Sequence, residues 1–99
     1  MQLLTKEITT KLPALYTQEN EEDPMVICKF FAVWSNWTWY GIEFDGEDLF
    51  FGYVSGHEAE LGYFRLSELQ GLKGPMGLGI ERDLYFKAQP LSEIKKLHE

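Results

Sequence analysis

The chain has 99 residues, a net charge of −7 and an aromatic content of 15%. This length suits one domain, residues 1–99, and is too short for two. A composition of 44% hydrophobic and 25% charged residues excludes a disordered or collagen-like chain. Residues 1–50 carry three basic and nine acidic side chains, so direct binding to nucleic acid or to an anionic membrane is not expected.

Three features of the sequence favour the cytoplasm. Charges at Lys6 and Glu7 come too early for a secretory signal peptide, and the longest uncharged run, residues 30–42, is too short to span a membrane. The single cysteine, Cys28, permits no internal disulfide, which fits a reducing compartment, and we expect it to be a small core residue. The oligomeric state has no signature in the sequence.

The first predicted element is a short helix. Thr5 can cap it, and Ile8, Leu12 and Leu15 lie near helical spacing. Pro13 should end or bend the helix around Leu12.

An acidic loop and three strands follow. Residues 17–24 contain four acids and predict a solvated loop. Residues 25–34 are rich in β-branched and aromatic residues and predict a central strand, and residues 37–44 and 48–54 predict the next two. Asp45-Gly46 predicts a two-residue type I′ hairpin turn, because both residues tolerate positive φ.

The remaining elements are shorter. Residues 62–66 predict a fourth strand, Ser67 and Gln70 a capping box of a short helix, and residues 80–86 a fifth strand or an irregular edge. A last helix after Pro90 should place Leu91, Ile94 and Leu97 on one face. We therefore predict an α+β fold: a four- or five-stranded antiparallel meander sheet with two or three short helices, mostly on one face.

The aromatic band of the second strand is a candidate binding surface. Alternation places Trp37 and Trp39 on one face and Tyr40, Ile42 and Phe44 on the other, so both faces are aromatic. Either one row is exposed as a binding surface, or the helices and the carboxy-terminal segment cover one face while long loops cover the other.

Acidic residues form two groups, which are Glu19, Glu21, Glu22 and Asp23 in the loop and Glu43, Asp45, Glu47 and Asp48 around the hairpin tip. If the loop folds beside the tip, the two groups form a negative pole that suits a basic partner; otherwise they are two solvated turns. The tip lacks the ligand spacing of a calcium loop, and no metal site is expected.

Candidate catalytic residues are sparse. His57 lies beside Glu58 and Glu60, and Arg82 and Asp83 are the other charged residues that a pocket near it would use. The glycine run at residues 71–79 lacks the preceding strand and the spacing of a phosphate loop, and it predicts a flexible loop or flap. We assign no catalytic residue and expect no cofactor.

Several motifs resemble a known family over nearly the full length. They are Leu12-Pro13-x-Leu15-Tyr16, Trp34-x-Asn36-Trp37-Thr38-Trp39-Tyr40, Glu43-Phe44-Asp45-Gly46, Gly56-x-Glu58-x-Glu60-Leu61-Gly62-Tyr63-Phe64 and Glu81-Arg82-Asp83-Leu84-x-Phe86. The chain is similar to a family of small bacterial proteins known as domain of unknown function 2958, often encoded on plasmids, conjugative elements and phages. The resemblance implies an accessory protein of mobile elements and carries over no activity.

These observations favour a non-enzymatic protein-binding module. Its partner would have a basic face. This face would meet an aromatic patch, Trp34, Trp37 and Trp39, and the acidic residues that border it, Glu43, Asp45, Glu47 and Asp48. A specific form of this hypothesis is an inhibitor of a DNA-targeting defence enzyme. The alternative is a small enzyme or ligand-binding protein with an aromatic pocket near His57.

Overall fold

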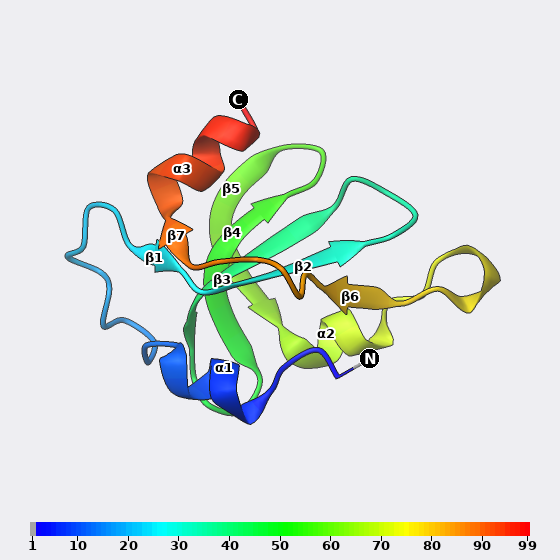
Figure 1. Cartoon of the computed structure of the whole chain (residues 1–99), viewed down its shortest axis with the longest axis horizontal. Helices are drawn as coiled ribbons and strands as arrows, with labels where there is room; N and C mark the ends of the chain where they lie inside the picture. The colour runs from blue at the N-terminus through cyan, green and yellow to red at the C-terminus, as the bar shows by residue number, and fades with distance from the viewer. Residues whose placement is uncertain (1) are drawn as a thin grey trace.

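A computed structural model describes residues 2–99 and contains one main sheet (Figure 1). Its five antiparallel strands lie in the order β5-β4-β3-β2-β6. They are β2 (Cys28–Ala32), β3 (Thr38–Phe44), β4 (Leu49–Ser55), β5 (Ala59–Arg65) and β6 (Ile80–Arg82). A second, two-stranded sheet pairs β1 (Met25–Val26) with β7 (Gln89–Pro90).

Three short helices accompany the sheets: α1 (Lys6–Lys11), α2 (Leu66–Gly71) and α3 (Leu91–Leu97), together with the 3-10 turn η1 (Pro75–Gly77). The predicted α+β fold with an antiparallel meander is confirmed. Within the described chain, no helix combines the length and the apolar character needed to cross a membrane.

The main sheet is covered on both faces. One face, which we call the Phe30 face, packs Phe30, Phe50 and Phe64 against Leu69 of α2, with Ile8 of α1 at its margin. The other, the Tyr40 face, packs Tyr40, Ile42 and Tyr53 against Leu91 and Ile94 of α3. All seven residues of β3 are consequently buried.

A β-bulge in β3 changes which side chains share a face. The register with β4 shifts between Gly41 and Glu43, so Ile42 and Glu43 both lie on the Tyr40 face and Phe44 on the Phe30 face. The prediction that Phe44 shares a face with Tyr40 was therefore wrong, because it assumed unbroken alternation.

A similar break divides the predicted strand at residues 25–34. Val26 packs on the Tyr40 face, whereas Ile27 and Cys28 both pack on the Phe30 face. Two successive residues on one face cannot belong to one regular strand, so β1 and β2 are separate elements.

The turn between β3 and β4 has four residues instead of the predicted two. Oδ1 of Asp45 accepts hydrogen bonds from the backbone N–H groups of Glu47, Asp48 and Leu49 at 2.8, 2.8 and 3.0 Å. Gly46 has the expected positive φ, +90°. The larger turn is stable because one carboxylate binds three donors.

The helix ends confirm one predicted cap and correct another. Oγ1 of Thr5 accepts from the N–H of Ile8, and α1 ends before Pro13. In α2 the predicted Ser67 cap was wrong: Arg65 precedes the helix, and its N–H donates to Oε1 of Glu68.

Helix α3 packs Leu91 and Ile94 on the sheet as predicted, but the third predicted residue, Leu97, does not join them. Leu97 is 67% exposed, while His98 lies over the Tyr40 face. His98 Nε2 is 2.7 Å from the Tyr40 hydroxyl, and Nδ1 is 3.0 Å from Oγ of Ser55. Leu91, Ile94 and His98 therefore form the sheet-facing stripe of α3.

A row of three glycines crosses the sheet. Gly41 of β3 pairs with Gly52 of β4, and Gly52 pairs with Gly62 of β5. A Cβ atom on Gly52 would meet the backbone oxygen of Tyr40, so the two strands approach more closely than a side chain would allow.

Candidate functional site

The predicted tryptophan patch is largely internal. Trp39 is buried, and Trp34 and Trp37 are half-buried. The Trp37 ring stacks on Trp39 at 5.9 Å between centroids and meets the exposed His57 edge-on at 5.6 Å. These rings chiefly join the sheet to its loops.

The glycine-rich segment lies against the same cluster. A Cβ atom on Gly74 would overlap the ring of Trp34, which shows how closely the loop packs there. A small apolar cavity of about 250 Å³ remains between Trp34, Trp37, Trp39 and Leu72. The three tryptophans are thus brought together as predicted, under a partial cover.

The acidic residues predicted to border the tryptophan patch lie in the β3–β4 turn, except Glu43, which lies in β3. Asp45 caps the β3–β4 turn, and Asp48 accepts hydrogen bonds from the N–H and hydroxyl of Ser67, each 2.8 Å long. Hydrogen bonds from Ser67 are the main reason that the pKa of Asp48 is lowered. Glu47 is exposed, while Glu43 points into the protein. In Figure 1 the acidic loop lies at the left and the β3–β4 turn at the bottom, so Asp45, Glu47 and Asp48 form no single pole with the loop. Glu43, in contrast, contacts the start of the loop.

The residues proposed for a pocket near His57 lie at opposite edges of the sheet. His57, Glu58 and Glu60 belong to the β4–β5 turn and β5, whereas Arg82 and Asp83 lie at the end of β6. A guanidinium nitrogen of Arg82 donates to the carbonyl oxygens of Gln2 and Leu3, and Asp83 pairs with Lys29 at 3.8 Å. The structure does not assemble these five residues into a site.

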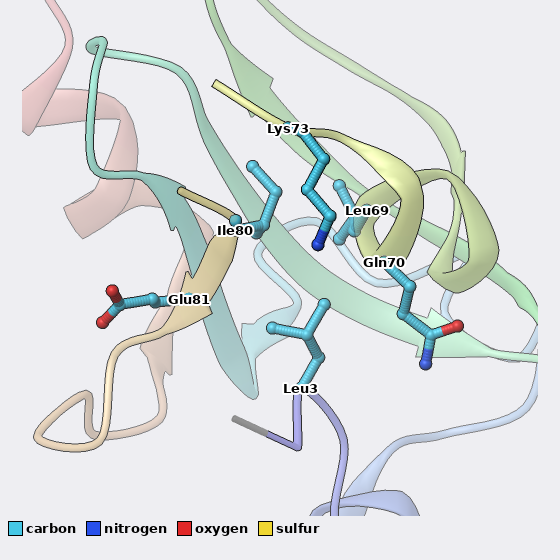
Figure 2. A pocket seen from close by; sticks show the side chains of 7 residues that line it. Leu3, Leu69, Gln70, Lys73, Ile80 and Glu81 are labelled. Carbon is cyan, nitrogen blue, oxygen red and sulfur yellow. The ribbon is translucent and has the colours of Figure 1, made fainter. Parts of the chain in front are cut away.

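A cavity of about 510 Å³ lies between the amino-terminal segment, α2 and β6; Figure 2 shows the side chains that line it. Leu3, Leu69 and Ile80 surround it, Lys73 reaches into it and Glu81 points away. The three apolar residues belong to the Phe30-face core. One exposed lysine and a core surface offer no cluster of reacting groups.

The most distinctive polar arrangement lies elsewhere and starts at Glu43. Its side chain is 4% exposed, and its two oxygens accept the N–H groups of Tyr16, at 3.0 Å, and Gln18, at 2.8 Å. Tyr16 has a φ of +69°, which is unusual for a residue with a side chain. Glu43 therefore holds the start of the acidic loop in a specific conformation on the sheet.

The other end of the acidic loop is also fixed. The carboxylate of Asp23 accepts the N–H of Ser92 at 2.8 Å and its hydroxyl at 2.6 Å, in the first turn of α3. Hydrogen bonds from Ser92 are the main reason that the pKa of Asp23 is lowered. With both ends fixed, Glu19, Glu21 and Glu22 stay exposed beside the sheet.

Between the acidic loop, the sheet and α3 lies an open groove of about 480 Å³, which we call the tyrosine groove. Its lining includes Tyr16, Ile42, Glu43, Phe51, Leu61, Tyr63, Leu91 and Lys95, and Glu19, Glu21 and Glu22 form its acidic rim. Tyr16, Tyr63 and Leu61 are 59%, 54% and 44% exposed. Loss of water raises the pKa of Tyr63, with a smaller contribution from the neighbouring Tyr16.

The tyrosine groove combines exposed aromatic area with negative charge. Three exposed carboxylates border it against one lysine, Lys95. Such a surface can bind apolar stems that carry positive ends. Within residues 2–99, no group of three or more His, Cys, Asp or Glu side chains is arranged to hold a metal ion.

The acidic loop was predicted from the sequence, but Tyr16, Leu61 and Tyr63 were not predicted to be residues of a binding site. The alternation of Leu61 and Tyr63 in β5 is a local signal for a shared face. Tyr16 has no comparable signal, because its position depends on Glu43, which is distant in the sequence.

Residues 3–98 match the family described as "Protein of unknown function (DUF2958)". No curated protein and no solved structure matches the chain. Since the match covers nearly the whole length, the chain belongs to this DUF2958 family.

Proposed function

We propose that this protein is a non-enzymatic binding module that takes a partner protein with a basic face at the tyrosine groove. The observation that carries the proposal is the exposure of Tyr16, Leu61 and Tyr63 beside three carboxylates that no described ion pair neutralises. Exposed tyrosines supply contact area at low entropic cost, and complementary charge speeds encounter.

The finer form of the proposal concerns the setting. The partner is a DNA-targeting defence enzyme in the bacterial cytoplasm, and the chain is an accessory protein of a mobile element that occupies the cationic DNA channel of this enzyme. A net charge of −7 favours such a channel electrostatically. Duplex DNA should then displace the chain from its captured partner, and a complex that DNA leaves intact would contradict this form.

A pull-down from bacterial lysate at low and high salt tests the binding module. Immobilised wild-type chain should retain a basic protein, identified by mass spectrometry, and high salt should release it. Tyr63→Ser should lose that protein. Tyr85→Ser is the matched control, because Tyr85 is 91% exposed but lies outside the groove.

Two results would contradict the proposal. One is an identical set of retained proteins for wild type, Tyr63→Ser and Tyr85→Ser. The other is the absence of any retained protein at either salt concentration. Native thermal melts of both variants are needed in either case, to show that the substitutions left the fold intact.

A further inference from the structure

The outer edge of β5 adjoins the tyrosine groove. β5 is the last strand on its side of the five-stranded sheet, and no other strand of residues 2–99 pairs with its outer edge. Leu61 and Tyr63 belong to this strand and also line the groove. The groove therefore opens directly onto a strand edge.

The register shows which backbone groups of β5 face outward. Leu66, just after the strand, donates its N–H to the carbonyl oxygen of Asp48, so the even-numbered residues bond to β4. In an antiparallel pair the alternate residues point away. The N–H and C=O groups of Leu61 and Tyr63 consequently face outward, while the outward N–H of Arg65 is occupied by the cap of α2.

We propose that β5 accepts an extended segment of the partner as an added strand, whose alternate lysine or arginine side chains lie in the tyrosine groove. This inference rests on the proposed function and specifies how the partner binds. Backbone hydrogen bonds to Leu61 and Tyr63 supply the pairing, as in other cases of strand addition.

Charge selects the chemistry of the added segment. On an added strand, every second side chain points to the same face as Leu61 and Tyr63. The methylene stem of lysine or arginine packs on these side chains, and its charged end reaches the acidic rim. Glu19, Glu21 and Glu22 outnumber Lys95, so a basic segment is favoured over an acidic one.

The same charges disfavour a second copy of this chain. Pairing β5 with β5 of another molecule would bring two acidic rims together in a protein of net charge −7. Like charges brought together oppose association. A foreign basic segment is therefore the expected occupant.

The probe is a seven-residue peptide of alternating lysine and valine, acetylated and amidated. Hydrogen exchange of the Leu61 and Tyr63 amides, followed by NMR, should be fast in the free protein and slowed by the peptide. An alternating glutamate and valine peptide should bind at least about tenfold more weakly.

A matched pair of variants tests the backbone contribution. Leu61→Pro removes an outward N–H, whereas Leu61→Thr removes the same side chain and keeps the donor. We expect Leu61→Pro to bind the lysine peptide about tenfold more weakly than Leu61→Thr. If Leu61→Pro does not fold, wild-type protein is tested with two peptides, one N-methylated at every lysine and one at every valine. One of the two patterns removes the peptide N–H groups that face β5, so that peptide should bind more weakly than the other.

Peptide binding that leaves the Leu61 and Tyr63 amides in fast exchange, with equal affinity of the methylated peptides, would overturn strand addition while the proposed function stands. Amide exchange that becomes slower with increasing protein concentration, in the absence of peptide, would show that a second copy of this chain occupies the β5 edge instead of a basic segment. Failure of the lysine peptide to bind while Tyr63-dependent capture persists would reject only the strand mode. Loss of both rejects the proposed function itself.

Discussion

Glu43 has a positioning role that its residue type alone does not suggest. A buried carboxylate is costly unless hydrogen bonds compensate it, and here both oxygens accept backbone N–H groups. In return, the left-handed conformation of Tyr16 is maintained and its ring is presented to solvent. Glu43 thus fixes the position of Tyr16, which lines the tyrosine groove.

Replacing Glu43 should destabilise the protein. Glu43→Ala leaves two backbone donors without acceptors, so we expect the free energy of unfolding to fall by about 2–3 kcal/mol in urea titrations. Glu47→Ala, at an exposed site, is the control and should change it by less than about 0.5 kcal/mol. Equal stability of both variants would refute the positioning role.

Gly46 tests the backbone of the β3–β4 turn. Its φ is +90° and no atom would lie within 4 Å of an added Cβ, so any cost of substitution comes from conformation. Gly46→Val should lower the free energy of unfolding by about 1–2 kcal/mol, since β-branched residues resist positive φ. Gly46→Asn should cost less, and identical melting temperatures for both variants would disprove this account.

Residue-scale prediction from sequence succeeded where the cause is local. Thr5 caps the next turn and Gly46 takes positive φ, because each depends on its immediate neighbours. The roles of Glu43 and Asp23 depend on residues far away in the chain. No local sequence pattern distinguishes Glu43 of β3 or Asp23 of the acidic loop from the solvated carboxylates.

Helix α3 is held to the sheet by a polar contact as well as an apolar one. His98 bridges the Tyr40 hydroxyl and Ser55, and Lys29 lies 5.8 Å from the centroid of the Tyr40 ring. Burial, with a smaller contribution from Lys29, lowers the pKa of His98 below its ordinary value of 6.5. The folded protein therefore favours neutral His98.

Stability should consequently depend on pH through His98. A lowered pKa in the folded state means that the unfolded chain binds the proton first, so this contribution is present above pH 6.5 and is lost as the pH falls through 6.5. Urea midpoints of wild type should decrease from pH 7.5 to 5.5 more than those of His98→Gln. Equal slopes for wild type and His98→Gln would rule out the effect.

The tryptophans on the β2–β3 connection and β3 should differ in their contribution to stability. Trp39 is buried, so Trp39→Ala should lose about 3–5 kcal/mol of the free energy of unfolding. Trp37 is half-buried and contacts an exposed histidine, so Trp37→Ala should cost less. Thermal melts compare them, and a native-like melt of Trp39→Ala would show that this ring is not core.

At the element scale, strand content was predicted better than strand boundaries. Alternation and turn residues indicated the meander, which depends on neighbours in sequence. The bulge at Glu43 and the pairing of β1 with β7 arise from tertiary contacts. Helical spacing from Ile94 allows either Leu97 or His98 to face the sheet. His98 does so because it forms hydrogen bonds there with Tyr40 and Ser55.

At the scale of the whole molecule, Cys28 should report global unfolding. The thiol lies in the Phe30-face core, and burial raises its pKa to about 12. Native protein should resist alkylation by iodoacetamide, whereas urea should make Cys28 reactive in parallel with the loss of circular dichroism. Rapid labelling without urea would show that this core opens locally.

The location of the groove is a whole-molecule property that the sequence alone does not encode in any one segment. Tyr16 and the acids come from the connection between α1 and β1, and Tyr63 comes from β5. The aromatic and acidic character of a binding face was a reasonable hypothesis from composition. Which aromatic residues lie beside which acids depends on the order of strands and on two anchoring carboxylates.

The row formed by Gly41, Gly52 and Gly62 leaves a line across the Phe30 face of the sheet without side chains. The space that their side chains would take is filled by neighbours, because Cys28 Sγ lies over Gly41 and the Phe64 ring lies over Gly52. On the opposite face, the residues next to these glycines include Ile42, Phe51, Leu61 and Tyr63, which line the tyrosine groove. A Cβ atom on Gly52 would collide with the backbone oxygen of Tyr40, so a side chain at this position would have to push β4 away from β3. Because Phe51 of β4 and Ile42 of β3 both line the tyrosine groove, the shape of the groove depends on the absence of a side chain at Gly52.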